Sequence, residues 1–401
     1  MSKFIQRTTE IKHDPYTDYV FESFDIQNRE STTVKIPMVP VNQLPKEWNI
    51  GVIYGGSGTG KTTLLREFGD LSDDSFDHEK ALISNFDFLE PNDATRLLSS
   101  MGLSSVPTWL RPFHTLSNGE QYRASLAYKV GKATDGDIIL IDEYTSVVDR
   151  DVAKAMSNAL QKYIRRTGKK IILGSCHFDI MEWLQPDWTY SPQKGRLEIA
   201  TCARQGRPEI KLQIVRCRLD AWEIFKQHHY LTEDINKSSK CFLTLYNGKP
   251  VCFNAVLPLP SGLLTNAFKM SRTVVLPDFQ GLGIGSRVTD YIASLYVANG
   301  KRFYVKTSNP ALWHHRDKAD HWKNGLEKSA AANRRYNENL KAKRAKAGLP
   351  PPDRMELFRE ATMKSHEYVG DVSHITEEDL HIINFNAHAY KDVAQNQISM
   401  F

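Results

Sequence analysis

A glycine-rich segment near residue 55 carries the residue types that bind phosphate. Residues 55–62 fit the pattern G-x-x-x-x-G-K-[ST], in which glycines turn backbone N–H groups toward an anion, a lysine reaches the outer phosphates and a hydroxyl binds Mg²⁺. The segment stands between a short apolar run, residues 50–54, and a stretch with helical spacing, so we expect a strand, a loop and a helix. The expected phosphate-binding residues are Gly55, Gly56, Ser57, Gly58, Thr59, Gly60, Lys61, Thr62 and Thr63. The alternative is a glycine-rich turn without a ligand.

Two carboxylates follow a second apolar run. Asp142 and Glu143 come directly after an expected buried strand, residues 137–141. A carboxylate at a strand end suits Mg²⁺ held through water, and a second carboxylate suits polarising the water that attacks a phosphate. We therefore expect Thr62 and Asp142 at the metal and Glu143 as the catalytic base, although either carboxylate alone could be a solvated strand end.

Three further segments complete an order that resembles the ABC-class ATPases over about residues 20–200. Residues 116–121 resemble the signature loop of that class, with Asn118 in place of its usual first glycine. Residues 146–149, which end at Asp149, resemble its D-loop, and His177 resembles its switch histidine.

The ABC resemblance implies a composite ATP site and therefore a homodimer. ATP and Mg²⁺ bound at Lys61 of one copy would be closed by Ser117 and Gly119 of another copy, and Asp149 would lie near the nucleotide. His177 would assist hydrolysis, and hydrolysis would release the dimer.

One element of the class has no clear counterpart in this sequence. The usual glutamine after the expected strand at residues 80–84 is absent, and Asn85, Asp87 or Glu90 could replace it. Lys61 and Ser117 are only 56 residues apart, which is short for the helical subdomain with which transporters hold their membrane subunits. A transporter subunit is therefore the least favoured function.

A second glycine-rich loop lies in the other half of the chain. An expected strand, residues 267–276, runs into Q-x-x-G-x-G and then into a helix at residues 286–298. The order resembles the acetyl-CoA loop of the GNAT acyltransferases, in which backbone N–H groups at a helix N-terminus hold a pyrophosphate. The competing dinucleotide fold would place an acidic residue after the next strand, where Lys306 and Thr307 stand. The resemblance implies acetyl-CoA or another acyl-CoA at Val274, Val275, Gln280, Gly281, Gly283, Gly285 and Ser286.

The catalytic groups of this second half are less clearly marked. The region in which many GNAT enzymes carry a tyrosine acid contains instead the run Leu-Trp-His-His at residues 312–315. The candidates occur in two runs, which are His228, His229 and Tyr230, and Ser365, His366 and Tyr368. Each has a structural alternative, because a histidine often caps a helix end and a tyrosine often belongs to the core.

The second half also loosely resembles relatives of the phage Mu Mom DNA-modification proteins, which implies a nucleobase as acceptor. Residues 311–348 carry ten basic and four acidic residues, a net charge of +6, together with Trp313, Trp322 and Tyr336. Such a mixture suits phosphate neutralisation and base stacking, and a solvated helix face is the alternative. We therefore expect a nucleic-acid partner, DNA rather than RNA.

Composition bounds the remaining choices. The chain has 401 residues and a net charge of +5, so two or three domains are expected. Its five cysteines form no C-x-x-C pair, which argues against a disulfide framework and a zinc ribbon and favours a reducing cytoplasm, that of the host if the chain is phage-encoded. No run of about 18 apolar residues occurs, so we expect no membrane span.

The elements predict an α/β protein. We expect short strands at residues 19–26 and 33–39, a linker at 192–208 and a helix at 220–229. We expect an ABC-class P-loop ATPase domain with a mainly parallel sheet over 1–200, a GNAT-fold mixed α/β acyltransferase domain over 201–312, and a basic, helix-prone segment over 313–401 that completes the transferase. The predicted function is an ATPase coupled to an acyltransferase that modifies a DNA base. The alternatives are an N-acetyltransferase of protein, tRNA or a small amine gated by the ATPase, and an ATP-driven binding switch with an inactive GNAT fold.

Overall fold

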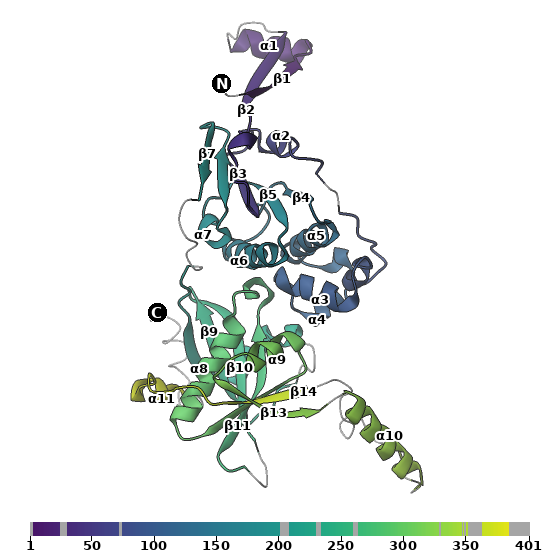
Figure 1. Ribbon diagram of the computed structural model, residues 1–401, viewed down its shortest axis with the longest axis vertical. Coiled ribbons are helices and arrows are strands. Elements are labelled where there is room, and N and C mark those ends of the chain that lie inside the picture. Colours follow the sequence, from purple (N-terminus) through teal and green to yellow (C-terminus); the bar gives the residue numbers. More distant parts are fainter. Residues whose placement is uncertain are drawn as a thin grey trace. The chain divides into compact units, whose positions relative to one another are not determined.

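The protein is described here by a computed structural model (Figure 1). It describes residues 3–24, 30–71, 74–200, 208–229, 234–259, 264–328, 330–346, 348, 350–351 and 363–384. The fold is mixed α/β, as predicted. It divides into two compact units, the first comprising residues 1–209 with 277–282 and the second comprising 210–276 with 283–401.

The first unit contains a mainly parallel sheet, as the alternation of strands and helices predicts. Its strand order is β4-β5-β3-β6-β7, and only β7 runs antiparallel to its neighbour. The strands are β3 (Ile50–Tyr54), β4 (Ile138–Ile141), β5 (Lys170–Ser175), β6 (Trp188–Ser191) and β7 (Arg196–Ile199). Because β3, β4 and β5 are parallel, the residues that follow them meet at one edge of the sheet.

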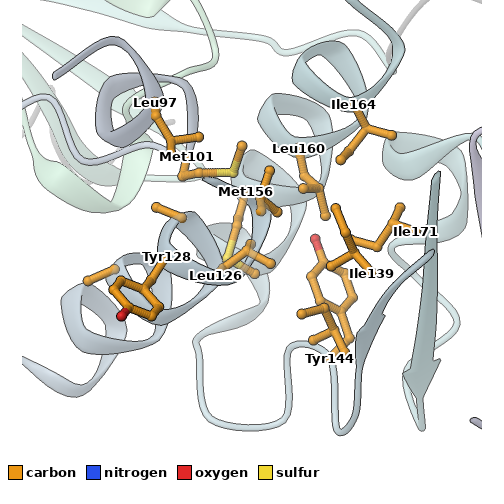
Figure 2. Packing of buried hydrophobic residues seen from close by; sticks show 14 of the residues in the cluster. Leu97, Met101, Leu126, Tyr128, Ile139, Tyr144, Met156, Leu160, Ile164 and Ile171 are labelled. Atoms are coloured by element: carbon orange, nitrogen blue, oxygen red, sulfur yellow. The ribbon is translucent and has the colours of Figure 1, made fainter. Parts of the chain in front are cut away.

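Helices connect these strands and cover the sheet. They are α2 (Lys61–Leu65), α3 (Pro91–Ser100), α4 (Val106–Trp109), α5 (Asn118–Lys132), α6 (Arg150–Thr167) and α7 (Met181–Leu184). Figure 2 shows Met156 and Leu160 of α6 facing Leu126 of α5 and Ile139 and Ile171 of the sheet. All five side chains are buried, so α5 and α6 are fixed to the sheet by apolar packing.

The first unit departs from the predicted elements at three places. The expected strand at residues 19–26 is replaced, over its described part, by helix α1 (Pro15–Ser23), which Asp14 caps by accepting from the N–H groups of Tyr16 and Thr17. The expected strand at 33–39 is confirmed as β2 (Ser31–Pro37), which pairs antiparallel with β1 (Phe4–Glu10). The strand expected at 80–84 is instead a 3-10 turn, Leu82–Asn85, and the expected linker at 192–208 contains β7.

The second unit contains one mixed sheet with the strand order β13-β14-β12-β11-β10-β9-β8. The strands are β8 (Gln213–Cys217), β9 (Lys240–Tyr246), β10 (Lys249–Pro258), β11 (Ala267–Val275), β12 (Arg302–Thr307), β13 (Trp322–Lys328) and β14 (Met363–Tyr368). Two of these strands, β13 and β14, come from the segment expected to be helix-prone, and they join this sheet beside β12.

Strands β11 and β12 form a parallel pair that ends early. Their register runs from Ala267 opposite Arg302 to Met270 opposite Val305, and both strands, which are fully described, continue beyond it. At this point β11 contains a bulge toward β10. Arg272 lies opposite Ala255 and Met270 lies opposite Val256, so Ser271 has no residue opposite it in the register. The two strands therefore separate after Met270 and leave an open edge of β11.

The two faces of this sheet carry different elements. On β10, Phe253 packs against Trp222 and Phe225, whereas the neighbouring Asn254 reaches Thr273 and, through it, α8 (Ile284–Ala298). Adjacent strand residues point to opposite faces, so residues 219–228 and α8 cover opposite faces. The helix expected at 220–229 is wrong in type: the structure has two 3-10 turns, Leu219–Ile224 and Lys226–His228.

The remaining helices of the second unit are α9 (Pro310–Asp317), α10 (Ala330–Lys346) and α11 (Glu377–Asn384). Trp322 Nε1 donates to Asp290 of α8 at 2.9 Å, and the guanidinium of Arg316 on α9 lies over the Trp322 ring. Helix α9 therefore covers the same face as α8. None of the helices formed by the described residues is long and apolar enough to span a membrane.

Candidate functional site

The predicted phosphate-binding loop lies between β3 and α2, as expected. Gly58 has φ +76° and Gly60 has φ +91°, and a Cβ at position 60 would lie 2.6 Å from Ile36 Cδ1. Positive φ favours glycine at both positions, and at position 60 a side chain would also crowd Ile36. The Lys61 ammonium donates to the carbonyl oxygens of Gly55 at 2.9 Å and Gly56 at 2.7 Å. The lysine thus lies over the loop, as a phosphate-binding lysine does.

The remaining hydroxyls of this segment stand on the same turn. Thr59 Oγ1 donates to the Gly56 carbonyl at 2.9 Å and so closes the loop, and Ser57 is exposed on it. Thr62 and Thr63 lie in the first turn of α2. Helix α2 is only five residues long, so the loop, Lys61 and the hydroxyls supply the phosphate-binding groups.

The predicted metal ligands are brought together from elements far apart in the chain. Thr62 Oγ1 donates to Asp142 Oδ2 at 2.6 Å, and Asp142 Oδ1 accepts from the Glu143 N–H at 2.9 Å. A hydroxyl and a carboxylate at this separation are oxygen ligands of the kind that Mg²⁺ prefers. The pair therefore fits a magnesium ion that accompanies bound nucleotide.

The segment that carries Glu143 has an unusual backbone. Glu143 has φ +49° and Thr145 has φ +68°. Positive φ is uncommon for any residue other than glycine, and it is rarest for a β-branched residue such as Thr145. Between them Tyr144 is fully buried and its hydroxyl lies 3.0 Å from Ser157 Oγ of α6. The Thr145 N–H donates to the hydroxyl of Tyr122 on α5 at 3.1 Å. Helices α5 and α6 therefore hold the strained segment from both sides.

His177 lies after β5, at the same edge of the sheet. Its N–H donates to Ser175 Oγ at 3.1 Å. Partial burial lowers the pKa of its imidazole and the nearby Arg150 lowers it further, against the opposing charge of Asp179. The lowered pKa favours the neutral imidazole at pH 7, which can accept a hydrogen bond.

The signature-like segment begins α5. Ser117 caps the helix, and its N–H and hydroxyl both donate to Glu120 Oε2 at 3.0 Å. Burial raises the pKa of Glu120, but the hydrogen bonds from Ser117 and Thr108 lower it by more in sum. Ser117 is exposed and Gly119 is half-buried, so the start of α5 faces solvent. Asp149 similarly caps α6 through the Asp151 N–H at 2.9 Å.

One substitute proposed for the missing glutamine has a structural role instead. The Asn85 side chain is buried, accepts from the Asp77 N–H at 2.7 Å and donates to the Ala81 carbonyl at 3.1 Å. Asn85 therefore closes the turn that precedes it. Asp87 and Glu90 are exposed and keep that possibility.

The second glycine loop joins β11 to α8 and contains Gln280. Gly281 has φ +83° and Gly283 has φ +78°, and Gly283 is the N-cap of α8 without a side-chain cap hydrogen bond. A Cβ on Gly285 would lie 3.0 Å from Val275 Cγ2, so glycine allows the helix to approach the strand. The N-cap of this fifteen-residue helix thus supplies no side chain to its first N–H groups, among them that of Ser286. This geometry fits the pyrophosphate of coenzyme A.

Val274 and Val275 lie on the part of β11 that has separated from β12. Val274 is buried with the Trp222 cluster, and the adjacent Thr273 hydroxyl accepts from Asn254 Nδ2 at 3.0 Å. The described register between β11 and β12 ends at the pair Met270–Val305, before these two residues. A strand that has separated from its neighbour can bind the amides of a linear ligand, as the pantetheine arm of coenzyme A requires.

The histidine and tyrosine candidates do not form one site. His229 packs against Trp222, and His228 lies in the same 3-10 segment, on one face of the sheet. His366 and Tyr368 of β14 lie on the opposite face, where Tyr368 packs edge-on against Trp322. Tyr230 lies outside the described residues. Ser365, which alternates with His366, points to the other face.

The face that carries His366 contains one partner that the sequence did not indicate. His366 Nε2 lies 2.8 Å from Asp317 Oδ1, and Lys364 Nζ lies 3.1 Å from Asp317 Oδ2. The hydrogen bond from His366 lowers the pKa of Asp317 and Lys364 lowers it further, whereas burial opposes both. Asp317 is 49 residues from His366, at the end of α9, so no local pattern could have paired them.

The basic segment is divided by the fold. Arg316 is buried against Trp322, and Trp322 is itself buried, so neither is presented to a ligand and the prediction that Trp322 stacks on a base is wrong. Helix α10 instead is polar, with Tyr336 at 46% exposure. It carries one acidic residue, Glu338, and six basic ones, which are Arg334, Arg335, Lys341, Lys343, Arg344 and Lys346.

Comparison with known proteins gives similarity to solved structures only. No protein-family model matches the chain, and no curated protein matches it. A dimeric ATP-binding cassette in a post-hydrolysis state with ADP and Pi is 15% identical, with a TM-score of 0.34, over 50% of this chain and 98% of that one. A ribosomal-protein alanine N-acetyltransferase of Escherichia coli is 13% identical, TM-score 0.28, over 42% of this chain and 97% of that one. A Bacillus subtilis acetyltransferase in complex with CoA is 8% identical, TM-score 0.29, over 40% and 99%.

Proposed function

We propose that the chain binds and hydrolyses ATP in its first unit and that its second unit transfers an acyl group from acyl-CoA to nucleic acid, DNA rather than RNA. The observation that carries the ATPase part is the contact of Thr62 with Asp142, because it joins the phosphate loop to the end of β4 at 2.6 Å. When bound, ATP supplies the phosphoanhydride bond to be cleaved. Glu143 would orient the attacking water, and His177 would accept a hydrogen bond at the same edge.

The ATPase unit would act as a homodimer. Ser117 and Gly119 begin a helix whose exposed N-terminus suits the phosphates of nucleotide held by another copy. Val147 at 58% and Phe178 at 63% exposure flank Asp149 and His177 in sequence, and such apolar side chains suit burial against a second copy. Asp149 would then lie at the interface beside the nucleotide.

A dimer held by ATP can be tested with Glu143→Gln, which keeps the residue's volume and removes its base. We expect ATP binding to persist and hydrolysis to fall about 10²- to 10⁴-fold. Light scattering should show a dimer with ATP and Mg²⁺ and a monomer when either is removed. A protein that stays monomeric with bound ATP would contradict the composite site.

The acyl-CoA part rests on the second glycine loop and on the separated edge of β11. Gly283 and Gly285 allow an anion to approach the start of α8 closely. The part of β11 beyond its last register pair with β12, Met270–Val305, leads to this point. When bound, acyl-CoA supplies the acyl group as a thioester.

The nucleic-acid part rests on helix α10. Its exposed basic side chains are of the kind that neutralises phosphates, and the exposed Tyr336 is able to stack on a base. Lys341, Lys343 and Lys346 replaced together by glutamine should lower the slope of log affinity against log salt by about 2.7 for double-stranded DNA, if each contacts one phosphate. The matched control removes three positive charges from the first unit, at Lys3, Lys12 and Lys35, which are also exposed. An unchanged slope in the α10 variant would contradict a phosphate-binding role for this helix.

The whole proposal is tested by mass spectrometry of nucleosides from DNA of cells that express the wild type, Lys61→Ala or Ser286→Glu. The glutamate introduces a charge in the first turn of α8 without changing the glycine backbone, and Ser286→Ala is its control. We expect a modified nucleoside in the wild type and the alanine control that is absent in Ser286→Glu. Its level in Lys61→Ala reports whether ATP binding is required. DNA without any modified nucleoside would refute DNA as the acceptor.

A further inference from the structure

His366 has one ring nitrogen without a partner in the interior of the second unit. The residue is 1% exposed, and its Nδ1 has no hydrogen-bond partner among the described residues. An unpaired buried polar atom costs about 1–3 kcal/mol, so its retention requires an explanation. The other ring nitrogen, Nε2, is 2.8 Å from Asp317 Oδ1.

Asp317 determines which nitrogen of His366 carries the proton. Its pKa is lowered by His366 and by Lys364, so the carboxylate is charged and can only accept hydrogen bonds. The Nε2 atom of His366 must therefore donate, and in the neutral ring Nδ1 keeps its lone pair. Lys364 holds the second carboxylate oxygen at 3.1 Å and thereby fixes the plane of the Asp317 side chain. The arrangement produces an oriented proton acceptor.

The strand register places this acceptor beside the separation of β11 and β12. His366 lies opposite Val305, and Val305 lies opposite Met270, the last pair that joins β12 to β11. Since neighbouring strands are about 4.8 Å apart, the His366 backbone is roughly 5 Å from β12 and roughly 10 Å from β11. A ligand that runs from the start of α8 along β11 toward Met270 would have its reactive end at this row.

We propose that His366 is the catalytic base of the acyl transfer and that Asp317 is its positioning residue. The inference rests on the proposed acyl-CoA function. His366 Nδ1 accepts a proton from the amine nitrogen of the acceptor as that nitrogen bonds to the thioester carbonyl carbon. The carbon–sulfur bond breaks and its electron pair goes to the sulfur. The thiolate takes up one proton from solvent and His366 releases the one it accepted, so each acceptor gains one acyl group and loses one hydrogen.

The other candidates fit this role less well. His228 and His229 lie on the opposite face of the sheet. Tyr368 is on the same face as His366, but it packs against Trp322 and burial raises its pKa, so it remains protonated and cannot accept a proton.

Two substitutions separate the base from its positioning residue. His366→Gln keeps an N–H donor for Asp317 and removes the basic nitrogen. In Asp317→Asn the Lys364 ammonium, which can only donate, hydrogen-bonds to the amide oxygen. The amide NH₂ then faces His366 Nε2, which must accept, so the ring proton moves to Nδ1. His374→Gln is the matched control, because His374 is exposed in the same unit.

The first measurement is thiol release from acetyl-CoA in the presence of sheared double-stranded DNA, together with acetyl-CoA affinity by calorimetry. Both variants should lose about 10²- to 10⁴-fold in kcat with the affinity unchanged, and the control should match the wild type. Transfer by His366→Gln within threefold of the wild type would refute the role of His366 alone. A wild type that binds acetyl-CoA without transfer would refute both this inference and the acyl-transfer function.

The second measurement does not depend on turnover. The ¹⁵N shifts of labelled histidine at pH 8 should show His366 in the wild type protonated at Nε2 and unprotonated at Nδ1, and the reverse in Asp317→Asn. A ring protonated at Nδ1 in the wild type would refute the inference even if acyl transfer occurs.

Discussion

Tyr122→Phe should lower the rate of ATP hydrolysis without lowering ATP affinity. The Tyr122 hydroxyl accepts the N–H of Thr145 at 3.1 Å, and Thr145 is fully buried. The substitution leaves that N–H unsatisfied, which costs about 1–3 kcal/mol. Glu143 and Thr145 both have positive φ, a conformation that persists only when its surroundings hold it. We therefore expect the segment to relax when this hydrogen bond is lost, and the relaxation should move Glu143 out of position.

The expected size follows from that free energy. One to three kcal/mol corresponds to a decrease in kcat of about 5- to 150-fold, since each 1.36 kcal/mol is tenfold. Lys61, Thr62 and Asp142 do not contact Tyr122 through any hydrogen bond described here, so the Kd for ATP should stay within twofold.

Tyr128→Phe is the matched control for this prediction. Tyr128 lies on the same helix, α5, and belongs to the buried cluster against which Tyr122 packs (Figure 2), so the substitution removes the same kind of hydroxyl from the same helix. Steady-state hydrolysis and ATP titration of both variants, with thermal melts, provide the comparison. If Tyr122→Phe melts earlier and keeps its kcat, the hydroxyl has only a structural role and the reasoning fails.

Three further predictions concern the first unit. Asp142→Asn keeps an acceptor for Thr62 but removes the charge, so Mg²⁺ affinity in the presence of ATP should fall about 10- to 100-fold in a metal titration of the hydrolysis rate. Burial raises the pKa of Asp187, but the N–H groups that donate to its carboxylate and its ion pair with Arg165 lower that pKa by more. The stability that the charged carboxylate contributes is therefore present above about pH 4 and is lost as the pH falls through the folded-state pKa. Urea unfolding should show this loss on the acid side in the wild type and not in Asp187→Asn. Ser117→Ala removes the N-cap of α5 and should cost about 1 kcal/mol in urea unfolding, with a wild-type midpoint refuting the capping role.

The two glycine loops and their flanking strands and helices were predictable, because each depends on a few residues that are adjacent in sequence. Gly58, Gly60 and Gly283 have positive φ, so the local conformation itself selects glycine. The strand that precedes Asp142, β4, was equally clear, because a largely buried parallel strand is a continuous apolar run. The roles of these residues in catalysis stay predictions.

The errors occurred where local patterns have two solutions. The apolar residues of α1 permit a strand or a helix, and the cap at Asp14 decides for the helix. Residues 219–228 contact the sheet as two 3-10 turns, a distinction that hydrophobic spacing does not make. The strand β13 was hidden in a basic segment, because its partner β14 lies beyond a long stretch of sequence.

The contact between His366 and Asp317 depends on the register of β14 and therefore could not be predicted from β14 alone. On the other face of the same strand, Arg302 donates to both oxygens of Glu367 at 2.7 and 2.9 Å. A shift of one residue would exchange the two faces, so that Glu367 would turn toward α9 and His366 away from Asp317. The ion pair on one face and the hydrogen bond on the other thus require the same register. The residues that fix the proposed base in place therefore include one, Glu367, that points away from it.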